Sequence, residues 1–167
     1  EFVGTHPIAG SDRSGTDAAS ADLFKEVLCI ITQTERTDPG SLEKIEKLWD
    51  GIGAKVVTMT PDEHDRVFSL VSHLPHVTSS ALVKTVADID PSYINFSGQG
   101  FKDTTRIAMS SPELWVDICR SNRKNIIQHI ELLSHNLILL KDMLEKEDYD
   151  SLRSFLQNAK ELRKTVG

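Results

Sequence analysis

Two segments that are far apart in the sequence contain residue types suited to acid–base chemistry and to anion binding. In the first, residues 4–15, His6 precedes Pro7 among three glycines and several hydroxyl and charged residues. Proline holds the residue before it in an extended conformation, and an imidazole gains or loses a proton near neutral pH. We interpret His6 as a candidate hydrogen-bonding or acid–base residue; the alternative is a tight surface turn.

The second segment, residues 98–106, contains two glycines followed by Lys102, Asp103 and Arg106. A guanidinium group binds a carboxylate through two parallel hydrogen bonds. Arg106 is therefore a candidate anion-binding residue, which Asp103 could orient. The alternative is a solvated loop in which lysine and aspartate pair locally.

Histidines and a tryptophan in two further segments could line a pocket. His73 and His76 lie on one side of a predicted helix that Pro75 interrupts. Two histidines three residues apart, without a third ligand at a fixed spacing, are a weak signal for zinc. We favour a polar pocket where the helix is kinked. Trp115, in the first turn of a later helix, belongs either to the core or to the wall of a ligand pocket.

Strand and helix signals alternate in residues 1–60. The apolar, β-branched run 27–31 predicts a strand that is covered on both faces. Residues 1–15 are expected to form a loop, and residues 16–26 have weak helical character. The chain opens on Glu1 rather than on methionine, and its first residues resemble the end of a strand, so we expect native sequence to precede them.

A helix and a second strand follow. Asp38 supplies an N-cap and Pro39 the first helical turn, and apolar residues at helical spacing continue to Gly51 and Gly53, which end the helix. Residues 54–59 predict a second strand. The resulting α/β unit is too small to stand alone as a domain.

From Thr60 onward the patterns predict helices only. Thr60 and Glu63 form a capping box that begins a helix over residues 61–88. Pro75 should kink this helix, because its ring removes a backbone donor and crowds the preceding turn. Residues 90–110 are expected to form an irregular connector.

Two predicted helices complete the chain, one from residue 112 to residue 146 and one over residues 149–165. The first has a heptad seam of apolar residues. This seam belongs either to the core of a helical bundle or to the centre of a homodimer, since few other helices are available to cover it. The seam consists of Ile126, Ile130, Leu133, Leu137, Leu140 and Leu144, with Ile127 and Ile138 beside it.

Taken in this order, the segments resemble the prephenate dehydrogenase family. The matching motifs are His-Pro-Ile-Ala-Gly at 6–10, Met-Thr-Pro-Asp-Glu-His-Asp at 59–65, Ser-His-Leu-Pro-His at 72–76, Gly-Phe-Lys-Asp-Thr-Thr-Arg at 100–106 and Pro-Glu-Leu-Trp at 112–115. The fold that this implies is mainly α. We expect a C-terminal remnant of a Rossmann-type nucleotide-binding α/β domain at 1–60, followed by an all-helical substrate-binding and dimerisation domain at 61–167.

The resemblance implies a function in tyrosine biosynthesis, as a homodimer. Because no signal peptide or membrane span is visible, a cytoplasmic location is the default expectation. The reaction is the oxidative decarboxylation of prephenate to 4-hydroxyphenylpyruvate, with hydride transfer to NAD or NADP. Arogenate, which presents the same ring, is the alternative substrate. By resemblance, neutral His6 accepts the proton of the substrate hydroxyl, and Arg106 binds a substrate carboxylate.

Seven more residues are implied in substrate binding: Ser11, Asp12, Ser72, His76, Gly100, Asp103 and Trp115. Asp12 and Asp103 would hold Arg106 in an ionic network. His76 would line the pocket and meet tyrosine as product or inhibitor.

The chain departs from the family pattern in two places. Gln99 interrupts the glycine run that the family shows before its Phe-Lys-Asp motif. In addition, the Gly-x-Gly-x-x-Gly turn that binds a dinucleotide pyrophosphate is absent from all 167 residues. No cofactor-binding residue can therefore be assigned. We expect the chain alone to bind the cofactor poorly and to be a fragment of a longer gene product.

Composition excludes several other classes of protein. Of the 167 residues 39% are apolar and 26% charged, which is ordinary for a globular protein. A net charge of −6 without a basic block argues against nucleic-acid binding. No apolar run reaches the length of a membrane span, and no signal peptide is visible. The two cysteines, without partner spacing, are expected to be thiols in a reducing compartment.

Two interpretations from other classes compete with the dehydrogenase. One is a non-catalytic helical interaction module, in which the heptad seam is the function. The other is a zinc-dependent hydrolase that uses His64, His73 and His76.

Overall fold

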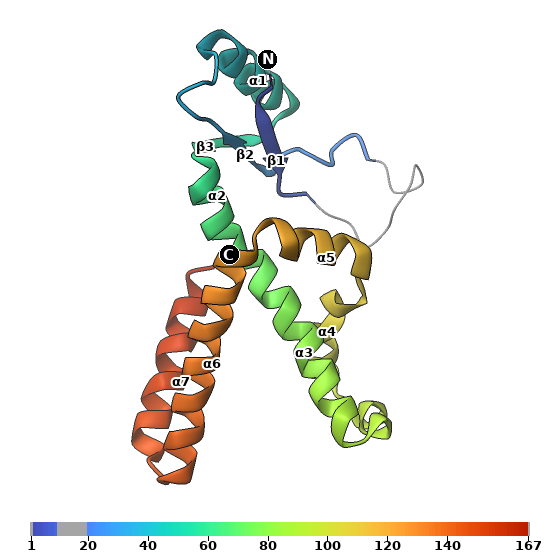
Figure 1. The fold of residues 1–167 in the computed structure, drawn as a ribbon, viewed down its shortest axis with the longest axis vertical. Helices are drawn as coiled ribbons and strands as arrows, with labels where there is room; N and C mark the ends of the chain where they lie inside the picture. The colour runs from blue at the N-terminus through green and yellow to red at the C-terminus, as the bar shows by residue number, and fades with distance from the viewer. Residues whose placement is uncertain (1, 10–19, 167) are drawn as a thin grey trace. The chain divides into compact units, whose positions relative to one another are not determined.

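The structure, a computed structural model, describes residues 2–9 and 20–166, which fall into two compact units (Figure 1). The first unit, Glu1–Phe68, contains β1 (Gly4–Pro7), β2 (Leu28–Thr32), α1 (Pro39–Ile52), β3 (Lys55–Met59) and α2 (Pro61–Phe68). The second unit, Ser69–Gly167, contains the π-helix η2 (Ser69–His73), α3 (Leu74–Ile89), the 3-10 helix η3 (Pro91–Phe96), α4 (Gln99–Thr105), the 3-10 helix η4 (Arg106–Met109), α5 (Pro112–Ser121), α6 (Arg123–Glu145) and α7 (Tyr149–Lys164). The expectation of a mainly α chain with a short α/β segment is confirmed.

The sheet of the first unit has the strand order β1-β2-β3. Its central strand, β2, runs parallel to β3 and antiparallel to β1. Cys29, Ile30 and Ile31 are at most 2% exposed, so the prediction of a strand covered on both faces is confirmed. At the sheet edge, a Cβ on Gly4 would lie 2.5 Å from Thr32 Oγ1. A larger residue would therefore require the Thr32 side chain to rotate away or the strands to move apart.

The start of the chain agrees only in part with the sequence expectations. The strand end expected in the first residues is present as β1, but residues 4–7 were also assigned to the expected loop, because backbone pairing with β2 gives this polar segment a partner that the sequence does not reveal. Residues 21–26 form turns rather than the expected weak helix. The remaining residues of that expected helix, 16–19, lie outside the described residues.

The helix ends in the first unit follow the sequence signals. The Asp38 carboxylate accepts the backbone N–H of Ser41 at 2.8 Å and caps α1, which ends at Gly53 with φ of 90°. At the start of α2, the Glu63 N–H donates to the Thr60 hydroxyl at 3.2 Å, and the Glu63 carboxylate accepts the Thr60 N–H at 2.9 Å. The predicted capping box is therefore confirmed.

The helix expected over residues 61–88 is interrupted one turn before Pro75. Its hydrogen bonding changes to the π pattern of η2, and α3 then continues to Ile89. Because Pro75 has no N–H to offer the preceding turn, a wider turn accommodates the missing bond. A buried hydrogen bond of 2.7 Å between the Ser69 hydroxyl and His129 Nδ1 of α6 supports this segment.

Two boundaries of the second unit differ from those expected. The connector expected at 90–110 is largely helical, as η3, α4 and η4. The helix expected from 112 to 146 is broken at Asn122, whose side chain is buried and hydrogen-bonded to His73 Nδ1 at 3.3 Å. A buried amide needs such a partner, and its local backbone, with φ of −108° and ψ of 29°, separates α5 from α6.

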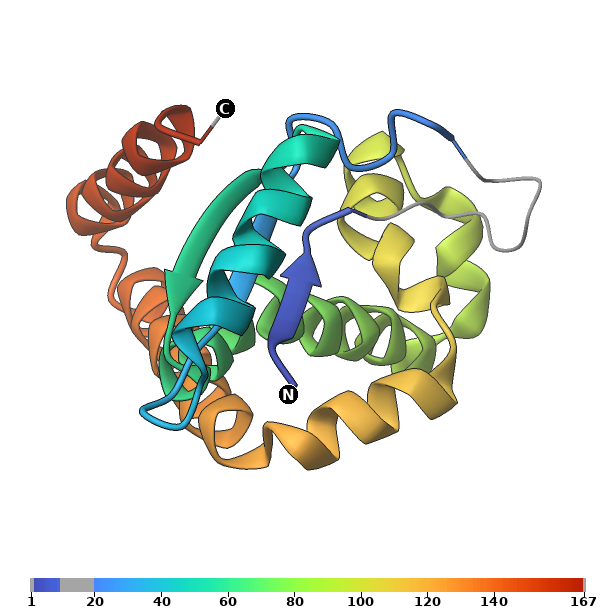
Figure 2. The same cartoon turned by 90° about the horizontal axis from the view of Figure 1, so that it is seen from above.

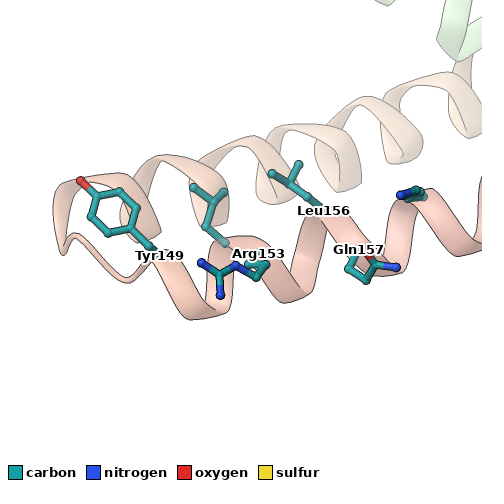
Figure 3. A pocket seen from close by; sticks show the side chains of 6 residues that line it. Tyr149, Arg153, Leu156 and Gln157 are labelled. Atoms are coloured by element: carbon teal, nitrogen blue, oxygen red, sulfur yellow. The ribbon is translucent and has the colours of Figure 1, made fainter.

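Helices α6 and α7 run side by side (Figures 1 and 2). The heptad seam, which lies on α6, is only partly buried. Ile126, near the start of α6, is 4% exposed. Three other residues of the seam, spaced seven apart along α6, are exposed: Ile130 is 40%, Leu137 56% and Leu144 55% exposed. On α7, Tyr149, Arg153, Leu156 and Gln157 line a shallow groove of about 370 Å³ (Figure 3).

Candidate functional site

The candidate acid–base residue of the first unit, His6, lies on β1 within a short chain of hydrogen-bonded side chains. Its Nδ1 is 2.9 Å from Nε2 of His64 on α2. The other ring nitrogen of His64, Nδ1, is 3.0 Å from the carboxylate of Asp65. The ring of Phe68 lies against both imidazoles, with centroid distances of 4.7 Å to His6 and 4.6 Å to His64.

The surroundings of His6 favour its neutral form. Desolvation of the ring lowers the pKa of His6, and the positive charge that His64 carries when protonated lowers it further. A neutral imidazole has one unprotonated nitrogen that can accept a proton. The nearby thiol of Cys29 has a different character, because burial raises its pKa and keeps it protonated.

The candidate anion-binding residue of the second unit, Arg106, begins η4 and lines a cavity of about 770 Å³. This volume is typical of small-molecule sites. Among the described residues, no hydrogen-bonding or ionic partner of Arg106 is found. Its guanidinium is therefore available to an anionic ligand. Lys102 adds a second cation to the lining, which also includes Ser97, Gln99, Phe101 and Asp103.

The expected ionic network around Arg106 is not present in the described part of the chain. Asp103 instead accepts a hydrogen bond of 2.7 Å from the side-chain amide of Gln99. The two residues are four apart on α4, so they lie next to each other on one face. Asp12, the other expected member of the network, and Ser11 lie outside the described residues.

The glycines before Arg106 do not provide the backbone freedom that the sequence suggested. Gly100 lies within α4, and its carbonyl accepts the Thr104 hydroxyl at 2.8 Å. A Cβ added at Gly98 or Gly100 would meet nothing within 4 Å, and neither has a positive φ. In this conformation both positions would accept a larger residue.

His76 and Trp115 form an aromatic pair in the second unit. Their rings stack with centroids 3.4 Å apart and planes 17° apart, and both line a cavity of about 240 Å³. Burial lowers the pKa of His76, while its hydrogen bond to the Ile107 backbone acts in the opposite direction. Its Nε2 is buried without a hydrogen-bond partner. Ser72 lies half-buried in η2, outside this stacked pair.

Two side-chain contacts of the candidate site, His6 with His64 and Asp103 with Gln99, were not predicted from the sequence. His64 was considered only within a motif and as a zinc ligand, and Gln99 only as an interruption of a glycine run. The adjacent pair His64–Asp65 offered a signal, because a carboxylate beside a histidine commonly orients its ring. Nothing in the sequence indicated that β1 would bring His6 to that pair.

The described residues form neither a metal centre nor a pyrophosphate site. No group of three or more histidine, cysteine, aspartate or glutamate residues among them is arranged to hold a metal ion. The N-terminus of α1 is already capped by the Asp38 carboxylate, whose negative charge would repel a phosphate. Within residues 2–9 and 20–166, this helix start therefore offers no cradle for a dinucleotide pyrophosphate. None of the described helices is both long enough and apolar enough to cross a membrane.

Comparison with known proteins gives matches along nearly the whole chain. Residues 60–158 match the family model described as "Prephenate dehydrogenase, dimerization domain", and residues 1–58 match "Prephenate dehydrogenase, nucleotide-binding domain". The chain is 36% identical to a prephenate dehydrogenase of Bacillus subtilis over 98% of its own length and 45% of that protein. It is 32% identical to a cyclohexadienyl dehydrogenase of Zymomonas mobilis over 97% of the chain and 57% of that protein.

Solved structures show the same similarity. Prephenate dehydrogenase from Aquifex aeolicus, in complex with hydroxyphenyl propionate and NAD+, has a TM-score of 0.93 and 37% identity over 99% of this chain and 59% of that one. Arogenate dehydrogenase from Synechocystis has a TM-score of 0.88 and 29% identity over 99% of this chain and 62% of that one. The chain thus spans about half the length of the curated relatives it matches.

Proposed function

The chain belongs to the prephenate dehydrogenase family, and we propose that it takes part in the oxidative decarboxylation of prephenate to 4-hydroxyphenylpyruvate. NAD or NADP is the hydride acceptor in this proposal, although the residues described here do not form its pyrophosphate site. The proposal rests on His6, whose pKa is lowered by desolvation and by the charge of His64 and whose Nδ1 lies 2.9 Å from His64 Nε2, so that its other ring nitrogen can accept a proton. The cytoplasmic location expected from the sequence is part of the same proposal.

The chain's own residues would bind the substrate and move one proton. Neutral His6 accepts the proton of the ring hydroxyl as that carbon becomes a carbonyl carbon. The guanidinium of Arg106 binds a substrate carboxylate through two hydrogen bonds. As the ring carboxylate leaves as carbon dioxide, the electrons of its bond to the ring complete the aromatic system, and the carbonyl oxygen takes up the proton held by His6 to become the phenol hydroxyl. Ser11, Asp12, Ser72, Gly100 and Asp103 remain predicted substrate-binding residues.

A direct assay tests the reaction and its substrate. The complete gene product that contains residues 1–167 would be supplied with prephenate or arogenate, each with NAD or NADP. We expect reduced nicotinamide and 4-hydroxyphenylpyruvate to form in equal amounts from prephenate. Turnover of arogenate alone, giving tyrosine, would transfer the assignment to the alternative substrate. Absence of turnover with both would contradict the proposal.

We also propose that the protein is a homodimer that uses α6. An exposed apolar stripe lies on α6, within the region that matches a dimerisation-domain model. It consists of the seam residues Ile130, Leu137 and Leu144. Such a stripe is normally covered. A charge at its centre, Leu137→Glu, should therefore give a monomer in light scattering. Gln128 lies on the opposite face of α6 from Leu137. Gln128→Glu is therefore the matched control and should remain dimeric.

Tyrosine, as product or inhibitor, is proposed to meet the pair formed by His76 and Trp115. The buried Nε2 of His76 has no hydrogen-bond partner, and a phenol hydroxyl could donate to it. Tyrosine titration should then inhibit the wild type and inhibit His76→Leu at least tenfold more weakly. Equal inhibition of both proteins would remove His76 from this role.

A further inference from the structure

Three side chains of the first unit, Asp65, His64 and His6, form a linear series of hydrogen bonds. The Asp65 carboxylate is 3.0 Å from His64 Nδ1, and His64 Nε2 is 2.9 Å from His6 Nδ1. Among the described residues, Nε2 of His6 has no hydrogen-bond partner. The series therefore has one end at a carboxylate and the other at an open imidazole nitrogen.

The carboxylate determines where the protons of this series lie. A carboxylate only accepts hydrogen bonds, so Nδ1 of His64 must carry hydrogen. In neutral His64 the other nitrogen, Nε2, then has a lone pair and must accept. The donor to it is Nδ1–H of His6, which leaves the lone pair of His6 on Nε2.

We propose that His64, oriented by Asp65, is a positioning residue that holds His6 in the Nδ1–H tautomer with Nε2 open to the substrate hydroxyl. This inference rests on the proposed function, because it assigns a role relative to the proton that His6 accepts. Without the acceptor at His64, the His6 ring could rotate or change tautomer, and only a fraction of molecules would present an unprotonated Nε2.

Packing restricts the ring of His64 more than that of His6, which is exposed. The side chain of His64 is 20% exposed and packs on Phe68, which also contacts His6. Of the other titratable groups nearby, the Cys29 thiol faces the backbone N–H of His6 rather than its ring. Glu63 of α2 is engaged in the capping box. The imidazole of His64 is therefore the polar group that contacts the His6 ring within the described residues.

Two substitutions of His64 separate positioning from packing, in the complete gene product. His64→Phe keeps a ring against Phe68 but has no acceptor, so kcat should fall about 10- to 100-fold while KM changes less than about threefold. His64→Gln places an amide oxygen near the position of Nε2, accepts from His6 and should restore kcat to within about threefold of wild type. The acid limb of its pH–rate profile should move to higher pH, because the charge that lowers the pKa of His6 is gone.

A matched control and a second measurement keep the outcomes distinct. Lys47→Gln, on the exposed surface of α1, should leave kcat unchanged. Nitrogen-15 NMR of the histidine side chains should show Nδ1–H for His6 in the wild type and in His64→Gln, and the other tautomer or a mixture in His64→Phe. A wild type without dehydrogenase activity would refute the proposed function, whereas an active wild type with equal kcat in His64→Phe would refute the positioning role alone. Nε2–H on His6 in the wild type would also refute it.

Discussion

The two candidate reactive residues, His6 in the first unit and Arg106 in the second, are prepared by their surroundings in opposite ways. His6 is tied through one nitrogen to His64 and is shielded by Phe68. Arg106 lines a large cavity and forms no ionic network with its neighbours among the described residues, since Asp103 is bound to Gln99 instead. One residue is oriented by the protein, and the other is left for a ligand.

This difference follows from the tasks that the two residues are proposed to perform. A proton acceptor must have its lone pair on a defined nitrogen, and only a fixed hydrogen bond at the other nitrogen defines it. A carboxylate-binding guanidinium is always protonated and needs no such tuning. An internal ion pair would instead compete with the ligand for its donors.

Loss of the proton acceptor should have the largest effect. For His6→Asn in the complete gene product we expect kcat to fall about 10³-fold, since general base catalysis typically contributes 10² to 10⁴. KM for prephenate should change little, and the dimer should persist in light scattering. Thr5→Ala, a neighbouring exposed position on β1, serves as the control. Unchanged turnover in His6→Asn would favour the non-catalytic interaction module.

Replacement of the guanidinium should affect binding more than chemistry. Arg106→Lys keeps the charge but loses the two-pronged donor, so KM for prephenate should rise about 10- to 100-fold with kcat within about fivefold. Arg120→Lys, whose surface partner is Asp117, should behave as wild type. A fall in kcat with normal KM would mean that Arg106 acts on the transition state and not on the bound substrate.

The pH dependence should reflect the histidine and not the arginine. Because desolvation and then the charge of His64 lower the pKa of His6, neutral His6 persists to below the ordinary imidazole value of about 6.5. Turnover should therefore be level above that value and decline about tenfold per pH unit only below the lowered pKa. Initial rates at saturating substrate measure this, and an acid limb above the ordinary value would contradict it.

Removal of the Gln99 side chain should have the smallest effect. In Gln99→Gly, Asp103 loses its amide partner and becomes free to pair with Arg106. Competition at the guanidinium should raise KM about threefold, in line with a partly exposed ion pair. Gln157→Gly, which loses a similar surface pairing with Glu161 on α7, is the control for helix propensity. A lower KM in Gln99→Gly would show that the amide, and not the pairing, hinders the ligand.

Local signals in the sequence predicted much of the fold and the residue types of the site. The caps at Asp38 and Thr60 and the buried run of β2 were all confirmed, because each depends on neighbours within a few residues. The break at Asn122 and the helical form of residues 90–110 could not be predicted, because they depend on partners distant in the sequence, such as His73.

By itself, the sequence determined that His6 precedes a proline, that Arg106 follows a lysine–aspartate pair, and that both belong to motifs of one family. Only the tertiary structure decided what surrounds each of them. Strand pairing of β1 with β2 brings His6 to His64, 58 residues later, and the helical turn of α4 turns Asp103 toward Gln99. A hydrogen bond requires atoms to meet within about 3 Å, and the folded backbone alone determines which side chains meet.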